Sequence, residues 1–209
     1  MSITKQLQWR YATKKFDSNK KITDQKLQVL KEAFNLTATS FGLQTLKLVI
    51  VDNPEARAAL LPHSYNQKQV VEASHLFVIC IQDDISTEDV VNYYKNVKAL
   101  RNTPDEVLEP FKKSLISMMD NKTVQERQQW SKNQAYIALG NLMTVCAVEA
   151  IDACPMEGFS PSDYDTLLNL KDKNLKSVLL LPVGYRSQDD MFANLKKVRT
   201  PLETAVITI

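Results

Sequence analysis

Apolar residues recur along the chain at two spacings, which predict both helices and strands. Leu27, Leu30 and Phe34 follow Thr23 at intervals of three and four residues. This spacing places them on one face of a helix, and Thr23 is a residue type that caps helix N-termini. The chain therefore contains an amphipathic helix directly after Thr23.

Short apolar stretches of strand length lie between the helical ones. They are "LKLVIVD" at 46–52, "HLFVICIQ" at 75–82 and "SVLLLPVGY" at 177–185. Their length and their Val and Ile content predict buried strands. The last six residues, "TAVITI", also favour a strand, which would expose an edge unless another strand paired with it.

Further helices are expected at residues 2–12 (capped by Ser2), 54–61, 87–101, 104–119 (capped by Thr103), 124–150 and 161–170. The end of the longest, "AYIALGNLMTVCAVEA", is apolar nearly all round, which predicts burial on every side in a packed centre or a subunit interface. Because strands and helices mix without strict βαβ repetition, the expected class is α+β.

Composition narrows the possible partners and compartment. The 209 residues have 44% hydrophobic content and a net charge of +2, so no overall field favours nucleic acid or an anionic membrane. The apolar runs are too short to span a bilayer, and the N-terminus has no secretory apolar segment. Three unevenly spaced cysteines are typical of a reduced cytoplasm.

Glycine is scarce, which limits how the chain could bind phosphate. The four glycines are Gly42, Gly140, Gly158 and Gly184, too far apart for a GxGxxG motif or a P-loop. Two histidines without nearby cysteine ligands do not predict a metal site. A phosphorylated ligand would therefore have to be held by side-chain cations.

Two groups of basic residues are candidates, in "RYATKKFD" from Arg10 and in "KKVRTP" from Lys196. Each alone is explained by a solvated helix end or loop, where basic residues complement the helix dipole. Together they would suit a phosphate dianion, which favours two or three convergent cations. The sequence leaves this choice open.

Two loops also have alternative interpretations. In "CPMEGF", Gly158 permits a positive φ at a turn, or it lets a ligand lie against backbone amides. In "YNQKQVVEASH", Asn66 and Gln69 face water at a helix start, or their amides contact the edge of a planar heterocycle.

In order along the chain, "RYATKKFD", "TATSFGLQTLK", "YNQKQVVEASH", "CPMEGF", "PVGY" and "KKVRTP" together resemble the FMN-dependent nitroreductase family, in its oxygen-insensitive NAD(P)H branch. The resemblance implies a single domain over 1–209. Its fold would be a three-layer sandwich, with a mixed central sheet flanked by helices. It also implies an intertwined homodimer with the C-terminal strand exchanged and the helix at 124–150 in the interface.

The resemblance further implies which residues bind FMN. They are Arg10, Tyr11, Ala12, Lys14, Asn66, Gln69, Pro155, Glu157, Gly158, Lys197 and Arg199, with Thr39, Ser40 and Gly42 supplied by the partner subunit. The backbone amide of Glu157 would face flavin N5, and no side chain acts as catalyst. Tyr65 and Phe111 would line the substrate pocket, or pack ordinarily.

Four features depart from the family pattern. Ala12 replaces a serine, Gly42 stands where many relatives have Asn, "QTL" at Gln44 to Leu46 replaces "QPW", and Gln69 replaces a lysine. A cation about 4 Å from reduced flavin contributes up to ~4 kcal/mol at an effective dielectric of 20, on the order of 80 mV for two electrons. We therefore expect a lower flavin potential here than in relatives with the lysine.

The implied activity is oxidation of NADH or NADPH and reduction of nitroaromatics, quinones or similar small electron acceptors, by ping-pong hydride transfer through flavin N5. The alternatives are a flavin, pteridine or enone reductase on the same scaffold and a non-catalytic FMN-binding protein. A nucleic-acid binder is disfavoured because the chain has no basic stripe.

Overall fold

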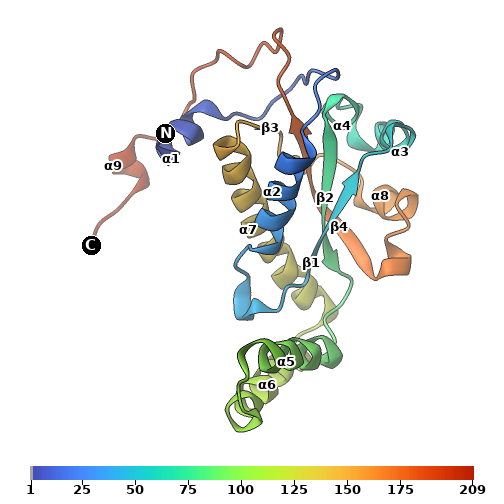
Figure 1. The fold of residues 1–209 in the computed structure, drawn as a ribbon, viewed down its shortest axis with the longest axis vertical. Coiled ribbons are helices and arrows are strands. Elements are labelled where there is room, and N and C mark those ends of the chain that lie inside the picture. The colour runs from blue at the N-terminus through green and yellow to red at the C-terminus, as the bar shows by residue number, and fades with distance from the viewer. Residues whose placement is uncertain (1) are drawn as a thin grey trace.

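The computed structural model describes residues 2–209 as three layers, a central sheet with helices on both faces (Figure 1). The strands are β1 (Leu46–Val51), β2 (His75–Gln82), β3 (Asp152–Ala153) and β4 (Leu175–Gly184), in the order β1-β2-β4-β3. All paired strands are antiparallel. The α+β class is thus confirmed, and the sheet is less mixed than expected, because its parallel pairing is confined to a single bridge between Ala12 and Ala153.

The side chains of β2 divide the core between the two helical layers. Phe77, Ile79 and Ile81 pack with α2 (Asp24–Asn35) and α7 (Val124–Val148). Their neighbours along the strand point the other way, as strand geometry requires, and pack with the helices of the second layer. These helices are α3 (Pro54–Leu60), α4 (Gln69–Glu72) and α8 (Pro161–Leu167). A strand buried on both faces reads as a continuous apolar run, which explains "HLFVICIQ".

A helical hairpin, α5 (Thr87–Arg101) and α6 (Asp105–Asp120), extends from one end of this sandwich. Its inner face packs on Leu43 and Trp130. The expected cap of α6 at Thr103 is wrong. Pro104 is the N-cap, and its carbonyl accepts hydrogen bonds from the backbone amides of Val107 and Leu108. Because Pro104 has an extended backbone, helical geometry begins only at the next residue.

The predicted caps Ser2 and Thr23 are confirmed, since each side chain accepts a hydrogen bond from the backbone amide three residues on. The first helix, α1 (Ile3–Trp9), is shorter than expected because Arg10 has extended backbone angles. Short 3₁₀ turns η1 (Ser40–Gly42), η2 (Pro62–Ser64) and η3 (Lys171–Lys173) complete the connections.

The C-terminal segment differs from its prediction. Leu202–Ala205 form a short helix, α9, and Val206–Ile209 follow it without strand pairing in the described chain. A strand needs a neighbour for its N–H and C=O groups, and a single copy offers none here. Burial of α7 on all sides is likewise not found within one chain, because Tyr136, Ile137 and Val148 are about half exposed.

Across residues 2–209, no helix combines the length and the apolar character needed to cross a membrane. The same residues contain no group of three or more His, Cys, Asp or Glu side chains placed to hold a metal ion.

Candidate cofactor site

The two groups of basic residues, which lie far apart in the sequence, line one pocket. Its volume is about 320 Å³, and its lining comes from both ends of the chain: Arg10, Tyr11, Ala12, Lys14, Phe192, Leu195, Lys196, Lys197 and Arg199. Figure 1 shows the N-terminal and C-terminal segments together above the sheet. Six of these nine residues are among those expected to bind FMN. We refer to Arg10, Lys14, Lys197 and Arg199 as the pocket cations.

The pocket cations have no carboxylate within ion-pair distance in the part of the chain that the structure describes. Burial and the charge of Arg199 lower the pKa of Arg10. Burial is also the largest cause that lowers the pKa of Lys197, and the charges of Arg10 and Arg199 lower it further. Lys197 Nζ donates to the backbone carbonyls of Gln8 (2.9 Å) and Arg10. The cations therefore repel one another, and an anion among them would relieve that repulsion.

The local sequence places Arg10 on this pocket because α1 ends one residue before it. The chain then runs beside β3, where Ala12 pairs with Ala153 and the backbone amide of Thr13 donates to the Ala153 carbonyl (3.3 Å). This pairing lays the segment from Arg10 next to "CPMEGF", which follows β3 directly.

Cys154 connects the pocket cations to Gln69. The distance from Lys14 Nζ to Cys154 Sγ is 4.0 Å, and the Gln69 side chain also hydrogen-bonds Cys154. Burial raises the pKa of the Cys154 thiol, and Lys14 and Gln69 oppose that shift. Gln69 is only 6% exposed, so the interpretation that it faces water is wrong, whereas Asn66 is exposed.

The "CPMEGF" turn is fixed to β4 and to the turn before α4. Met156 and Leu180 exchange backbone hydrogen bonds of 2.9 and 3.0 Å. The suggestion that Gly158 adopts a positive φ is wrong, because Gly42 is the glycine with positive φ among the described residues. Gly158 instead leaves room for the Gln67 side chain. Gln67 Nε2 donates to the Gly158 carbonyl (2.8 Å) and would lie 3.0 Å from a Cβ added at position 158.

Glu157 has an exposed carboxylate that accepts a hydrogen bond from Tyr136 (2.6 Å), on α7. Tyr65 lies against Gly158, with its Cδ2 3.7 Å from the Cβ position, and is 70% exposed. Pairwise contacts thus place Gln69 next to Lys14 through the buried Cys154, and Gly158 next to Gln67 and Tyr65.

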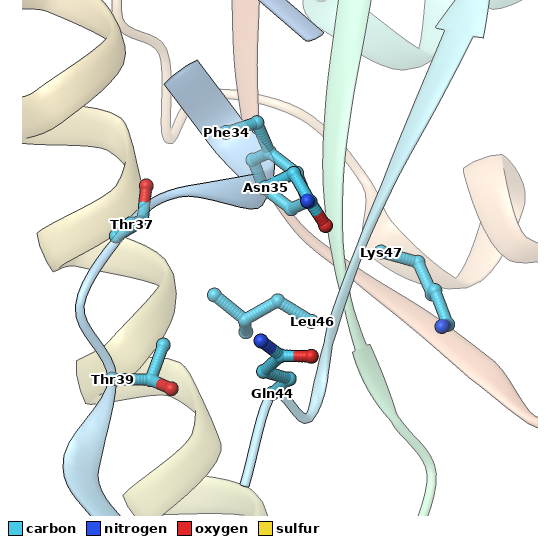
Figure 2. Close-up of a pocket in the computed structure, with 7 residues that line it drawn as sticks. All are labelled: Phe34, Asn35, Thr37, Thr39, Gln44, Leu46 and Lys47. Carbon is cyan, nitrogen blue, oxygen red and sulfur yellow. The ribbon is translucent and has the colours of Figure 1, made fainter. Parts of the chain in front are cut away.

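Thr39, Ser40 and Gly42 lie elsewhere in the chain, in the loop between α2 and β1. The Ser40 amide donates to Gln134 Oε1 on α7 (2.8 Å). Thr39 lines a separate pocket of about 80 Å³, shown in Figure 2, between the end of α2 and the start of β1. Figure 1 places this loop toward the end of α7 away from the chain termini. Within one chain, these residues therefore do not reach the pocket cations.

Phe111 is also distant from its expected neighbour Tyr65. It is 64% exposed on α6, at the hairpin end of the molecule, whereas the turn between α3 and α4 lies at the opposite end of the sheet. One chain alone does not bring the two aromatic side chains into a shared pocket.

Arg186 is a residue that the sequence did not suggest. Its guanidinium lies over the rings of Trp9 (4.4 Å) and Tyr11 (4.5 Å), and it pairs with the buried carboxylate of Asp152. The backbone amide of Arg186 also donates to Asp152 (2.8 Å). This stack fixes the segment that carries Arg10. No sequence signal marks it, because its members come from three separate parts of the chain.

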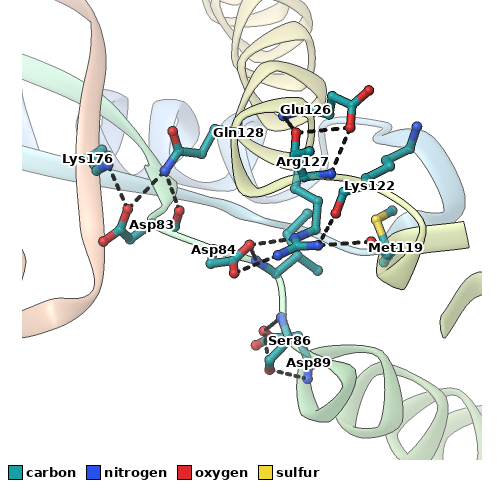
Figure 3. A network of polar contacts seen from close by, with 12 residues as sticks. Asp83, Asp84, Ser86, Asp89, Met119, Lys122, Glu126, Arg127, Gln128 and Lys176 are labelled. Atoms are coloured by element: carbon teal, nitrogen blue, oxygen red, sulfur yellow. Dashed lines mark hydrogen bonds and ion pairs between the residues drawn. The ribbon is translucent and has the colours of Figure 1, made fainter. Parts of the chain in front are cut away.

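A second arginine forms a polar network at the base of the hairpin (Figure 3). Arg127, at the start of α7, donates from Nε and Nη2 to the two carboxylate oxygens of Asp84, at 2.6 and 2.9 Å. Its Nη1 donates to the backbone carbonyls of Met119 (3.0 Å) and Lys122 (2.5 Å). Arg127 therefore joins the segment entering α5 to the segment leaving α6.

Comparison with known proteins shows what this arrangement is similar to. The sequence profile described as "Nitroreductase family" matches residues 7–185. YfkO of Bacillus subtilis (strain 168), named among the NAD(P)H nitroreductases, is 31% identical over 212 residues, covering 95% of this chain and 93% of its own. The oxygen-insensitive NAD(P)H nitroreductase of Salmonella typhimurium is 29% identical over 209 residues, covering 96% of both.

The fold is also shared with solved structures. A protein of Exiguobacterium sibiricum, crystallised in complex with FMN, superposes with a TM-score of 0.84 at 19% identity, covering 100% of this chain and 98% of that chain. At this identity the likeness is one of fold.

Proposed function

The chain belongs to the nitroreductase family, and on that premise we propose that it is an FMN-dependent oxidoreductase that oxidises NADH or NADPH. Its acceptors would be nitroaromatics, quinones or related flat electrophiles. The observation that supports this most is the convergence of the pocket cations from both ends of the chain, with no ion pair to a carboxylate among residues 2–209.

The residues present fit FMN. Burial and the charge of Arg199 lower the pKa of Arg10, and burial with the charges of Arg10 and Arg199 lowers that of Lys197. Four cations lining one pocket suit a phosphate dianion better than a neutral ligand. The pocket cations would hold the FMN phosphate, and the flavin, when bound, would supply the hydride chemistry that links oxidation of the nicotinamide to reduction of the acceptor.

The surface next to the pocket suits the rest of the cofactor. Gln69 and Asn66 offer amide donors and acceptors for the pyrimidine edge. The turn at Glu157 and Gly158 offers backbone amides, and Tyr65 supplies an exposed aromatic face beside them. No side-chain acid or base is required of this surface, because the chain's part in the reaction is to orient the ring and exclude water.

The active form would be a homodimer. The half-exposed apolar side chains Tyr136, Ile137 and Val148 on α7 and the exposed Val206–Ile209 segment leave apolar area that a second copy would cover. Such a dimer would carry the Thr39–Gly42 loop of one subunit to the pocket of the other, and the C-terminal segment to the partner's sheet. Light scattering of the purified chain measures this, and a monomer that reduces acceptors at full rate would contradict it.

The test of the function is spectroscopic and kinetic. We expect the purified chain to carry about one FMN per subunit, to bleach on addition of NADH or NADPH, and to regain its colour with a nitroaromatic or a quinone. A panel that adds free flavin, pterins and enones identifies the acceptor class. A chain that binds no FMN would overturn the proposal, and one that binds FMN without oxidising either nicotinamide would reduce it to an FMN-binding protein.

Gln69 makes the flavin potential a sharper test. A neutral amide in place of a lysine stabilises anionic reduced flavin less, so Gln69→Lys should raise the midpoint potential, by at most about 80 mV. Redox titration of both proteins measures the difference. An unchanged or lower potential in the variant would contradict the assigned position of Gln69.

A further inference from the structure

We propose that Asp190 assembles the cation pocket, as a positioning residue that holds the two ends of the chain in register around the cofactor phosphate. The identity of that phosphate rests on the proposed function. Asp190 lies just before the segment that carries Lys197 and Arg199, and it is only 4% exposed.

Asp190 accepts hydrogen bonds from both sides of the pocket. Its Oδ2 accepts from the Tyr11 hydroxyl (2.8 Å) and from the backbone amides of Lys14 (2.9 Å) and Lys15 (3.2 Å). Its Oδ1 accepts from the backbone amide of Phe192 (3.0 Å). One carboxylate therefore fixes the N-terminal segment between two pocket cations, and also the start of the C-terminal segment that carries the other two.

The chemical type of the groups that donate to Asp190 matters as much as their number. Asp190 is satisfied by amide and hydroxyl donors, so it makes no ion pair with the pocket cations and leaves their charge for a ligand. Those hydrogen bonds lower its pKa against the opposing effect of burial. The adjacent residue, Asp189, differs because it is exposed and forms an ion pair with Lys15 at the surface.

An amide at position 190 keeps the size of the side chain but not its function. Asparagine has one acceptor oxygen, and its NH₂ group would face a donor where a carboxylate oxygen now accepts. Asp190→Asn should therefore loosen the register of the two segments and spread the pocket cations, while the isoalloxazine surface at Gln69 and Gly158 keeps its own contacts.

The experiment compares FMN with riboflavin, which lacks the phosphate. Flavin is removed from the full-length chain, and binding is followed by fluorescence quenching in wild type, Asp190→Asn and the control Asp189→Asn. Wild type should bind FMN much more tightly than riboflavin. Asp190→Asn should weaken FMN at least tenfold and riboflavin less than twofold, and Asp189→Asn should change neither by more than about twofold.

The possible outcomes separate the two proposals. Equal weakening of FMN and riboflavin in Asp190→Asn, or FMN binding as tight as in Asp189→Asn, would overturn this inference alone. Failure of wild type to bind FMN would overturn the proposed function and the inference with it. Should Asp190→Asn not fold, Tyr11→Phe decides, because it removes one donor to Oδ2 and keeps the ring on Arg186. We expect it to weaken FMN two- to fivefold, and an unchanged preference for FMN over riboflavin would overturn the inference.

Discussion

Arginines at the two ends of this molecule occupy opposite electrostatic settings. At the base of the hairpin, Arg127 donates to both oxygens of Asp84 and to two carbonyls, and the hydrogen bond with Asp84 raises its pKa. In the pocket, Arg10 has other cations as neighbours, and burial and Arg199 lower its pKa. An arginine whose donors are satisfied within the chain holds the fold together, whereas one facing like charges is arranged for a ligand.

The largest expected effect tests the pocket side of this comparison. On the proposed function, replacing Arg10 and Arg199 together by Gln would remove two charge-assisted contacts to the FMN phosphate, each worth about 1.5–3 kcal/mol. We expect FMN affinity to fall by roughly a hundredfold or more, as measured by flavin fluorescence.

The matched control is Arg101→Gln, a basic residue in the last turn of α5. It should leave FMN affinity within about twofold. If the double variant retained wild-type affinity, the pocket would not be the phosphate site. Removal of the like-charge repulsion should at the same time leave the free energy of unfolding of the flavin-free chain unchanged or slightly raised.

Arg127→Met tests the structural role of the arginine at the base of the hairpin. It keeps the aliphatic part of the side chain but removes the hydrogen bonds to Asp84, Met119 and Lys122. We expect the free energy of unfolding to fall by about 1–3 kcal/mol, with faster amide exchange concentrated in α5 and α6. FMN affinity should stay within a few-fold of wild type. A loss of FMN binding as large as in the pocket variant would erase the distinction between the two regions.

Gly42→Ala should have a smaller effect, on the contact between the hairpin and the loop before β1. Gly42 has a φ of +70°, and an added Cβ would lie 2.5 Å from the Tyr93 hydroxyl oxygen. Left-handed backbone costs a non-glycine residue about 1–2 kcal/mol, and the hydroxyl must also move.

Denaturant unfolding measures this loss, and Tyr93→Phe separates its two causes. Removing the hydroxyl should recover the part of the loss due to the clash and none of the part due to φ. Strictly additive single variants would show that Tyr93 does not press on this glycine.

The smallest expected effect is a pH dependence of the local stability of the α5–α6 hairpin. The hydrogen bond from Arg127 lowers the pKa of Asp84 below its ordinary value of 3.8. The ion pair therefore stabilises the fold at pH values above about 3.8 and loses that effect as the pH falls through the lower, folded-state pKa. Because Asp84 is partly exposed, solvent screens the pair and the change is modest. Amide protection factors in α5 and α6, which are corrected for the intrinsic exchange rate at each pH, should fall on acidification in wild type, and fall less in Arg127→Met.

Much of the fold follows from local pattern. The strand at 75–82 was predicted to the residue, because its continuous apolar run of six residues, Leu76 to Ile81, is typical of a strand covered by helices on both faces. The helix over 87–101 and the cap at Thr23 are confirmed for similarly local reasons. The predicted cap at Thr103 failed because the Pro104 carbonyl accepts the first amide hydrogen bonds of α6. Pairing of "TAVITI" with a second copy stays a prediction.

The candidate site was only partly accessible from the sequence. Basic residues at 10–14 and 197–199 suggested a phosphate, but their convergence depends on Asp190 and on the parallel bridge at Ala12, neither of which has a sequence signature. Gln69 was placed by resemblance, and its contact with Cys154 depends on the packing of α4 against the turn after β3. Thr39, Ser40 and Gly42 reach the pocket only in the proposed dimer, which the pattern of one chain does not position.

The pocket that unites both termini also constrains when the protein can be loaded during its synthesis. Lys197 and Arg199 leave the ribosome only after strands β1 to β4 have been made, so a nascent chain would hold Arg10 and Lys14 without the other two pocket cations. Flavin capture is then a late event that reports the synthesis of residues 197–199. A ribosome stalled anywhere before residue 197 should yield colourless protein.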